Sequence, residues 1–232
     1  MAYPSRNSDY DHTTGDDRDC HSGVDDGGSP SSRAVPGARM PPPNRCAQVW
    51  EGPVGRGEFS AEQPLLWLLG AHGGAGVSVL TASIAPAGDC DRTWPDAAPE
   101  TGDSPLVVIV ARTHLSGLRR AYDLISQYHA GGTGAYGQLL GVITVADSDR
   151  PLRPEVRTEL AVLEAAAPAH WHVGWIEPWR SMTPDQLPSL APGQPLPEDK
   201  RDRRDFSITP PEPIRDLQAN LLAAARTAIT TR

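Results

Sequence analysis

The stretch Leu65-Leu66-Trp67-Leu68-Leu69-Gly70-Ala71-His72-Gly73-Gly74-Ala75-Gly76-Val77-Ser78 decides the fold of this chain. Its first five residues are all apolar and lie between Pro64 and Gly70, which predicts a strand buried on both faces. A glycine-rich turn follows. Apolar residues then recur at helical spacing over 77–84, which predicts a short helix that ends before Pro86. Strand, glycine turn and helix in this order are typical of a phosphate-binding loop.

Three more apolar runs follow along the chain, at 106–110, 139–145 and 171–176. Helical patterns separate them, with Ser116 as the expected N-cap of one helix and Pro154 opening another. Residues 86–104 are rich in Pro and Asp and are expected to form a loop. Strands that alternate with helices predict an α/β fold: a three-layer sandwich with a small, mostly parallel sheet covered on both sides.

Composition divides the chain into four regions. Residues 1–60 are dominated by Ser, Asp, Gly, Arg and Pro, and such a stretch buries too little apolar area to offset its ordering entropy, which predicts a disordered tail. The α/β domain is expected at 61–188, a Pro-rich, charged linker at 189–212 and an amphipathic helix at 213–232. Either the tail or the C-terminal helix is a candidate for binding an unknown protein partner. Each of these two segments could instead pack on the domain. In the tail, the residues that would pack are Val49, Trp50, Val54 and Phe59.

Charge and cysteine usage limit the function classes. A formal net charge of −8 provides no general attraction to nucleic acid or anionic lipid. No apolar run approaches the ~18 residues of a membrane helix, and aspartates stand near the N-terminus where a signal peptide would be basic and then apolar. Cys20, Cys46 and Cys90 form no Cys-x-x-Cys pair, which predicts free thiols. We therefore expect a soluble, cytoplasmic protein.

The glycine turn resembles the loop of the deviant Walker-A ATPases of the ParA and MinD kind, which reads Lys-Gly-Gly-x-Gly-Lys-Ser/Thr. This chain has His72-Gly73-Gly74-Ala75-Gly76-Val77-Ser78 in its place, so both family lysines are absent. The general phosphate-loop pattern begins with glycine, where this chain has Ala71. The chain also resembles uncharacterised actinobacterial proteins that carry Gly-Ala-His-Gly-Gly-Ala-Gly after a strand, a likeness that implies a family and no activity.

The resemblance to these ATPases covers about 65–180. Residues 106–128 are similar to a late strand and helix of the family, and Gly141-Val142-Ile143 is similar to its penultimate strand. Ile176-Glu177-Pro178 is similar to the segment that lines the nucleotide base. The family's Walker-B aspartate has no counterpart at the end of the 106–110 run, where Ala111 and Arg112 stand.

The resemblance implies a ligand site in the loop, with ATP or ADP and Mg²⁺ as the ligand. Backbone N–H groups of a glycine turn hold phosphate without any side chain. The loop residues of this site are Gly73, Gly74, Ala75, Gly76, Val77 and Ser78, and the Ser78 hydroxyl is the candidate magnesium ligand. Arg112 is the candidate for the missing positive charge, Asp147 for reading the base and Pro178 for lining it.

Efficient hydrolysis is not expected, because phosphoryl transfer depends on charge neutralisation that the loop lysine would provide. Three interpretations stay open: a degenerate phosphate loop that binds a nucleotide or phosphate, a protein-interaction module whose loop is an empty relic, and slow ATP-driven switching. In the relic, the loop glycines simply allow close packing, and Asp147-Ser148-Asp149 is an ordinary turn.

Aromatic and histidine side chains near the fourth run are weaker candidates. Trp171 and Trp175 are expected in the core, whereas Trp179 either covers a ligand or is an exposed contact. His170 and His172 share one face of the expected strand, but no Cys or second carboxylate lies at metal-ligand spacing, so no metal site is predicted there.

Overall fold

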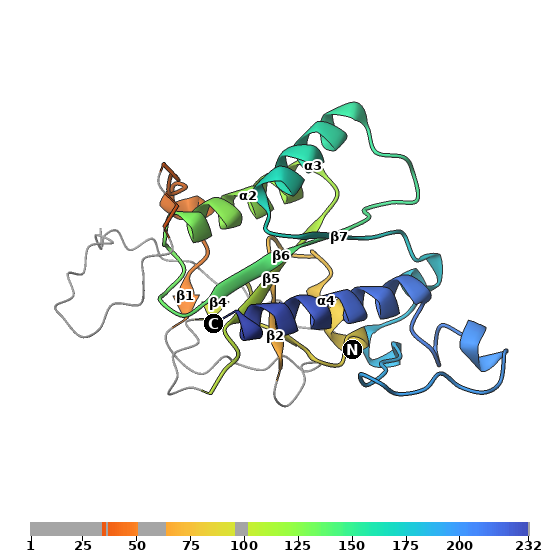
Figure 1. The fold of residues 1–232 in the computed structure, drawn as a ribbon. Helices are drawn as coiled ribbons and strands as arrows, with labels where there is room; N and C mark the ends of the chain where they lie inside the picture. The colour runs from red at the N-terminus through yellow and green to blue at the C-terminus, as the bar shows by residue number, and fades with distance from the viewer. Residues whose placement is uncertain (1–33, 36, 51–63, 96–101, 232) are drawn as a thin grey trace, which may run out of the picture.

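The computed structural model describes residues 34–35, 37–50, 64–95 and 102–231 (Figure 1). A five-stranded sheet forms its centre, and every neighbouring pair of strands in it is parallel. Its spatial order is β3 (Ala87–Asp89), β2 (Leu66–Gly70), β5 (Leu106–Arg112), β6 (Gln138–Val145) and β7 (His170–Val173). A small second sheet pairs β1 (Val49–Trp50) with β4 (Trp94–Pro95).

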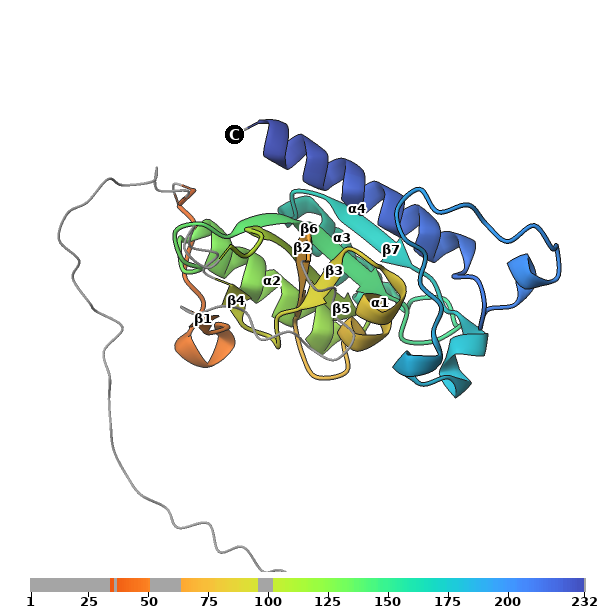
Figure 2. The same cartoon turned by 90° about the horizontal axis from the view of Figure 1, so that it is seen from below.

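Helices cover both faces of the sheet, which confirms the predicted α/β class with a parallel sheet (Figures 1 and 2). One face carries α1 (Val77–Ser83) and α4 (Glu212–Thr230), and the other carries α2 (Leu115–His129) and α3 (Pro154–Ala166). Short 3₁₀ helices lie in the connections: η1 (Pro43–Arg45), η3 (Glu177–Ser181), η4 (Pro184–Gln186) and η5 (Asp202–Arg204).

The sequence of strand β2 suits a position in the middle of the sheet. All of its residues are buried, and their side chains alternate between the two faces of the sheet. Leu66 and Leu68 join the cluster under α1 and α4, while Trp67 and Leu69 join the cluster under α2. A strand with helices on both faces has no polar side, so its sequence is apolar throughout.

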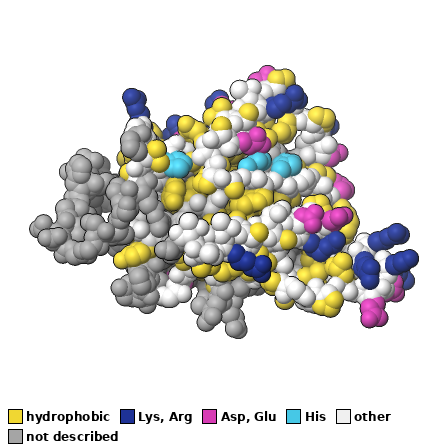
Figure 3. All heavy atoms as spheres, viewed as in Figure 1, with side chains coloured by type: hydrophobic (Ala, Val, Ile, Leu, Met, Phe, Trp, Pro, Cys, Tyr) yellow, Lys and Arg dark blue, Asp and Glu magenta, His cyan; other side chains and the backbone are white. Residues whose placement is uncertain are grey.

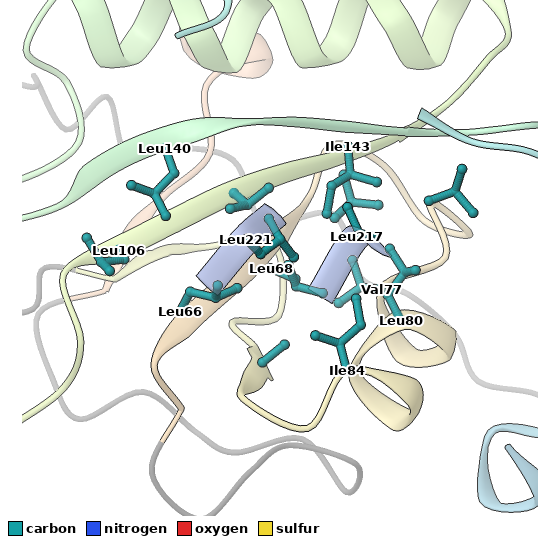
Figure 4. Close-up of a cluster of buried hydrophobic side chains, with 14 of the residues drawn as sticks. Leu66, Leu68, Val77, Leu80, Ile84, Leu106, Leu140, Ile143, Leu217 and Leu221 are labelled. Atoms are coloured by element: carbon teal, nitrogen blue, oxygen red, sulfur yellow. The ribbon is translucent and has the colours of Figure 1, made fainter. Parts of the chain in front are cut away.

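Helix α4 packs on the domain as part of its core. Its side chains Ile214, Leu217 and Leu221 are buried against the face of the sheet that also carries α1. Figure 4 shows Leu217 and Leu221 close to Leu68 of β2. Of the two alternatives for residues 213–232, the structure therefore shows packing on the domain.

Residues 86–104 do not form only a loop, as the sequence had suggested, because they contain β3 and β4. Strand β3 has no apolar pattern, since it consists of Ala87, Gly88 and Asp89. Small residues are required there: a Cβ on Gly88 would lie 2.6 Å from Cζ3 of Trp67. The large Trp67 side chain thus fills the space that a side chain on the edge strand would otherwise occupy.

The start of α2 also differs from the prediction. His114, and not Ser116, is the N-cap, because its Nδ1 accepts a hydrogen bond of 3.0 Å from the Gly117 N–H. The Ser116 hydroxyl lies 3.0 Å from the same Nδ1. An imidazole nitrogen therefore does what a serine oxygen usually does at this position.

Part of the predicted tail is placed against the domain. Residues 37–50, which we call the strap, include η1 and β1 and lie beside α2 (Figure 2). The rest of the predicted tail, at 1–33, 36 and 51–60, lies outside the described residues, as do Cys20, Val54 and Phe59. Cys90 is a buried free cysteine. In the described part of the chain, no helix is both long and apolar enough to cross a bilayer.

Candidate functional site

The order of the strands opens a crevice beside the end of β2. The chain adds β3 on one side of β2 and then returns to add β5 on the other side. The helices that follow β2 and β5 consequently lie on opposite faces of the sheet. In open α/β sheets, ligands bind at the carboxyl ends of the strands at such a switch point. The glycine turn, residues 71–76, leaves β2 at this place.

The glycine turn presents backbone N–H groups that have no partner among the described residues. Gly74 has a φ of +78° and Gly76 a φ of +102°, left-handed conformations that favour glycine. Ala75 N–H donates to the His72 carbonyl over 3.3 Å. The N–H groups of Gly73, Gly74 and Gly76 donate to no residue that the structure describes. The turn therefore has donors available for a ligand.

Arg112 holds the glycine turn from the neighbouring strand β5. Its Nε donates to the Gly74 carbonyl over 3.3 Å, and its Nη1 donates to the Ala146 carbonyl over 2.8 Å. Its backbone N–H donates to Nε2 of His72 over 3.2 Å. A guanidinium has five N–H donors, so donors remain after these two side-chain bonds. Arg112 can thus position the turn and still offer positive charge beside it.

A hollow of about 370 Å³ lies over the turn. The predicted residues Gly73 to Ser78 and Arg112 all line it. Its lining also includes Asp89, Asp91 and Arg92. These three were not predicted as site residues, because residues 86–104 were expected to form a loop. Asp89 ends β3 and the other two follow it, and this strand is too short and its side chains are too small to show a periodicity.

Oxygen ligands suited to a hard cation line this hollow. The Ser78 hydroxyl and the carboxylates of Asp89 and Asp91 are of the type that Mg²⁺ prefers. Burial raises the pKa of Asp89, the charge of Asp91 raises it further, and the hydrogen bond from the Asp91 N–H acts in the opposite direction. No group of three or more His, Cys, Asp or Glu side chains within the described ranges has metal-binding geometry.

A second hollow, of about 300 Å³, adjoins the first on the other side of Arg112. Gly76, Val79 and Arg112 line both hollows. The walls of the second are largely apolar, and they include Trp175, Ile176 and Trp179. The indole N–H of Trp179 is buried and has no hydrogen-bond partner among the described residues.

The structure does not bring Asp147 and Pro178 to these hollows. Asp147 is exposed after β6, and its backbone N–H donates to the Thr113 hydroxyl over 3.1 Å. Pro178 lines a different hollow, of about 790 Å³, together with Lys200 and Arg201. Figure 3 shows basic side chains gathered over the segment that holds η5, beside this third hollow. Of the segment 176–178, it is Ile176 that lines the second hollow.

No protein-family model, curated protein or solved structure matches this chain. The likeness of its glycine turn to the ParA and MinD loop therefore stays a prediction.

Proposed function

We propose that this protein is a degenerate phosphate-loop protein that binds a nucleotide or a related phosphate ligand without efficient hydrolysis. The phosphates would lie on the turn Gly73–Ser78, beside Arg112, with Mg²⁺ bound through the Ser78 hydroxyl. The observation that carries the proposal is that the N–H groups of Gly73, Gly74 and Gly76, at the switch point of the sheet, have no partner within the described ranges. Consecutive N–H groups in such turns form anion-binding concavities.

Packing does not account for the glycines of the turn. A Cβ on Gly73 or Gly74 would have nothing within 4 Å. Packing glycines in the same fold look different: a Cβ on Gly88 or Gly141 would approach other atoms to 2.6 Å or 2.4 Å. The left-handed backbone explains glycine at 74, and neither packing nor φ explains it at 73. Free access to the backbone from the hollow explains both, which favours a ligand over a relic.

The adjoining hollow suits an aromatic base. Its apolar walls and tryptophan rings offer stacking surface, and the buried Trp179 N–H has no acceptor among the described residues. An unsatisfied buried donor costs about 1–3 kcal/mol, which a ligand acceptor would recover. A nucleotide with its phosphates on the turn would place its base on this side of Arg112.

Hydrolysis is disfavoured because the turn has no lysine. Val77 occupies the position of the family's loop lysine, and its side chain is buried against the core. Arg112 is partly engaged with the carbonyls of Gly74 and Ala146. Charge neutralisation at the terminal phosphate is therefore weaker than in an active ATPase. The alternative of an interaction module loses one of its elements, since the apolar face of α4 is used in the core.

Thermal unfolding of the full chain tests the proposal. Millimolar Mg-ATP or Mg-ADP should raise the unfolding midpoint, because a ligand that binds only the folded state stabilises it by about 2.7 kcal/mol at a hundred times its Kd. In a chain of this size that is a rise of several degrees, roughly 2–4 °C per kcal/mol. Gly74→Asp should abolish the rise, because it places a carboxylate where the phosphate would lie.

Gly193→Asp is the matched control. Gly193 also has a positive φ, of +80°, with open space around it, but it lies away from the turn. The two variants therefore share the added charge and the backbone strain. A rise retained in Gly193→Asp and lost in Gly74→Asp supports the site. No rise with ATP, ADP or phosphate in the unaltered protein would show that the turn is a relic.

A further inference from the structure

We infer that Arg92 is a ligand-contacting residue of this site, and that Arg92 and Arg112 grip a polyphosphate from opposite sides of the glycine turn. The inference rests on the proposed function and deepens it by naming the chemical class of ligand: a chain of two or more phosphates, in preference to a single phosphate. Neither arginine belongs to the turn itself, so the pair would provide from neighbouring strands the charge that a loop lysine would otherwise supply.

The topology places the two arginines on either side of the turn. Arg92 follows β3, which lies on one side of β2, and Arg112 ends β5, which lies on the other side. Both line the hollow over the turn. The Arg92 stem also lies close to the end of β2, since a Cβ on Gly70 would be 3.4 Å from its Cγ. A ligand on the turn would therefore lie between two guanidinium groups.

The Arg92 guanidinium is available for a ligand. The side chain is exposed, and it forms no hydrogen bond or ion pair with any residue within the described ranges, although Asp89 and Asp91 line the same hollow. Arg112 uses Nε and Nη1 on two carbonyls and keeps its other donors for a ligand. Arg92 brings a second guanidinium, with all of its donors available, to the same hollow.

The backbone at Arg92 is in the left-handed conformation. Asp91 and Arg92 have φ values of +48° and +58°, a left-handed pair without glycine. Left-handed conformation costs an L-residue about 1–2 kcal/mol, and strain of this kind gathers at functional sites. Glycine at position 92 would avoid the cost but would remove the guanidinium.

Neighbouring contacts hold this turn in place. Asp91 N–H donates to Asp89 Oδ1 over 2.9 Å, and the Thr93 hydroxyl donates to the Cys90 carbonyl over 2.7 Å. Trp94 N–H then donates to the Gln48 carbonyl of the strap over 2.7 Å. The strained pair is thus fixed from both ends, and the Arg92 that it carries lines the hollow over the glycine turn.

The charges of the hollow favour a polyphosphate with a divalent cation. Arginine binds phosphate oxygens in pairs through its planar fork, so two separate arginines suit two phosphate groups. Asp89 and Asp91 bring negative charge to the same hollow and disfavour a bare anion. A magnesium ion carried by the polyphosphate would offset that repulsion. A chain of phosphates also offers each arginine a phosphate group of its own, which a single phosphate does not.

Calorimetric titration of the full chain with Mg-pyrophosphate and with phosphate tests the inference. Arg92→Gln should weaken pyrophosphate binding by about tenfold or more, the usual effect of losing a charged hydrogen bond, and should change phosphate binding less. Arg226→Gln, on the exposed side of α4, is the control and should bind as the unaltered protein does.

Arg92→Gly separates a ligand contact from a structural role. Because glycine adopts positive φ freely, this variant should unfold without ligand at the same temperature as the unaltered protein or above it, yet bind pyrophosphate as weakly as Arg92→Gln. Pyrophosphate binding that survives in Arg92→Gln but is lost in Gly74→Asp would overturn the role of Arg92 and leave the proposed function standing. An unaltered protein that binds neither pyrophosphate nor nucleotide would overturn both.

Discussion

At the scale of single residues, the edge of the sheet holds a chain of hydrogen-bonding side chains. His170 Nδ1 lies 3.2 Å from Glu164 Oε1, and its Nε2 lies 2.8 Å from the hydroxyl of the buried Thr144. That hydroxyl also lies 3.1 Å from Nδ1 of His172. If His170 donates to Glu164, the Thr144 hydroxyl donates to His170 and accepts from His172, which assigns one proton to each contact.

Burial lowers the pKa of His170, Glu164 opposes that shift, and His172 adds to it. The unfolded chain therefore binds a proton at His170 at a higher pH than the folded chain does. Stability should rise with pH between the lowered pKa and the ordinary value of about 6.5, and fall as the protein is acidified through that window.

Urea unfolding at a series of pH values checks this expectation. His170→Gln should flatten the dependence just below the ordinary histidine pKa of about 6.5, because it removes the group that titrates differently in the two states. The pKa of Asp89 is raised in the folded protein, so Asp89 makes stability fall as the pH rises, and it does so at lower pH than His170. Asp89 is present in both proteins, so the difference between the variant and the unaltered protein reports on His170 alone. Equal slopes for both proteins would contradict the prediction.

At the scale of elements, Gln127 of α2 fastens the strap. Its Oε1 accepts from Ala47 N–H over 2.9 Å and from the Trp94 indole over 3.1 Å. Its Nε2 donates to the carbonyls of Ala47 over 2.8 Å and of Gly132 over 2.7 Å. The buried amide therefore bonds the strap much as a neighbouring strand would, and it joins the strap to β4.

Gln127→Leu should lower the free energy of unfolding by about 2–4 kcal/mol, because it leaves buried N–H and carbonyl groups of three segments without partners. Urea unfolding measures the loss. Gln194→Leu makes the same change in an exposed turn, where one hydrogen bond to Ala191 N–H is involved, and should cost about 0.5 kcal/mol or less. A Gln127 variant no less stable than this control would show that the strap contributes little.

At the scale of the whole molecule, α4 closes one layer of the core although it lies more than a hundred residues from β2 in the sequence. Leu221 is fully buried in the cluster that contains Leu66 and Leu68 (Figure 4). The domain is therefore incomplete without residues 212–230, and the preceding segment 189–211 connects two parts of one core.

Leu221→Ala should destabilise the protein by about 2–5 kcal/mol, the usual cost of removing a buried leucine side chain. Ile229→Ala lies on the same helix at a side chain that is 55% exposed, and should cost much less. The two variants are compared by urea unfolding. Similar small losses in both would mean that α4 packs loosely and that the sheet is stable without it.

The fold could be predicted from runs of residues that carry their own signal. The apolar stretches at 65–69, 106–110 and 139–145 correspond to β2, β5 and β6, since a strand buried on both faces needs no partner to reveal its pattern. The glycine turn could be placed because its glycines also form a local pattern in the sequence. Strand β3 could not, because three small residues at an edge carry no periodicity and depend on Trp67 for their place.

The sequence by itself determined the α/β class, the glycine turn after the first strand of the sheet and the absence of a lysine in that turn, because all three are local patterns. Tertiary structure alone decided that α4 completes the core, that Gln127 holds the strap and that Arg92, Asp89 and Arg112 meet over the turn. Each of these contacts joins residues that lie far apart in the sequence. Local propensity carries no information about which strand ends meet. The sequence alone therefore could not show that Arg92 and Asp89 lie beside Arg112 at the glycine turn.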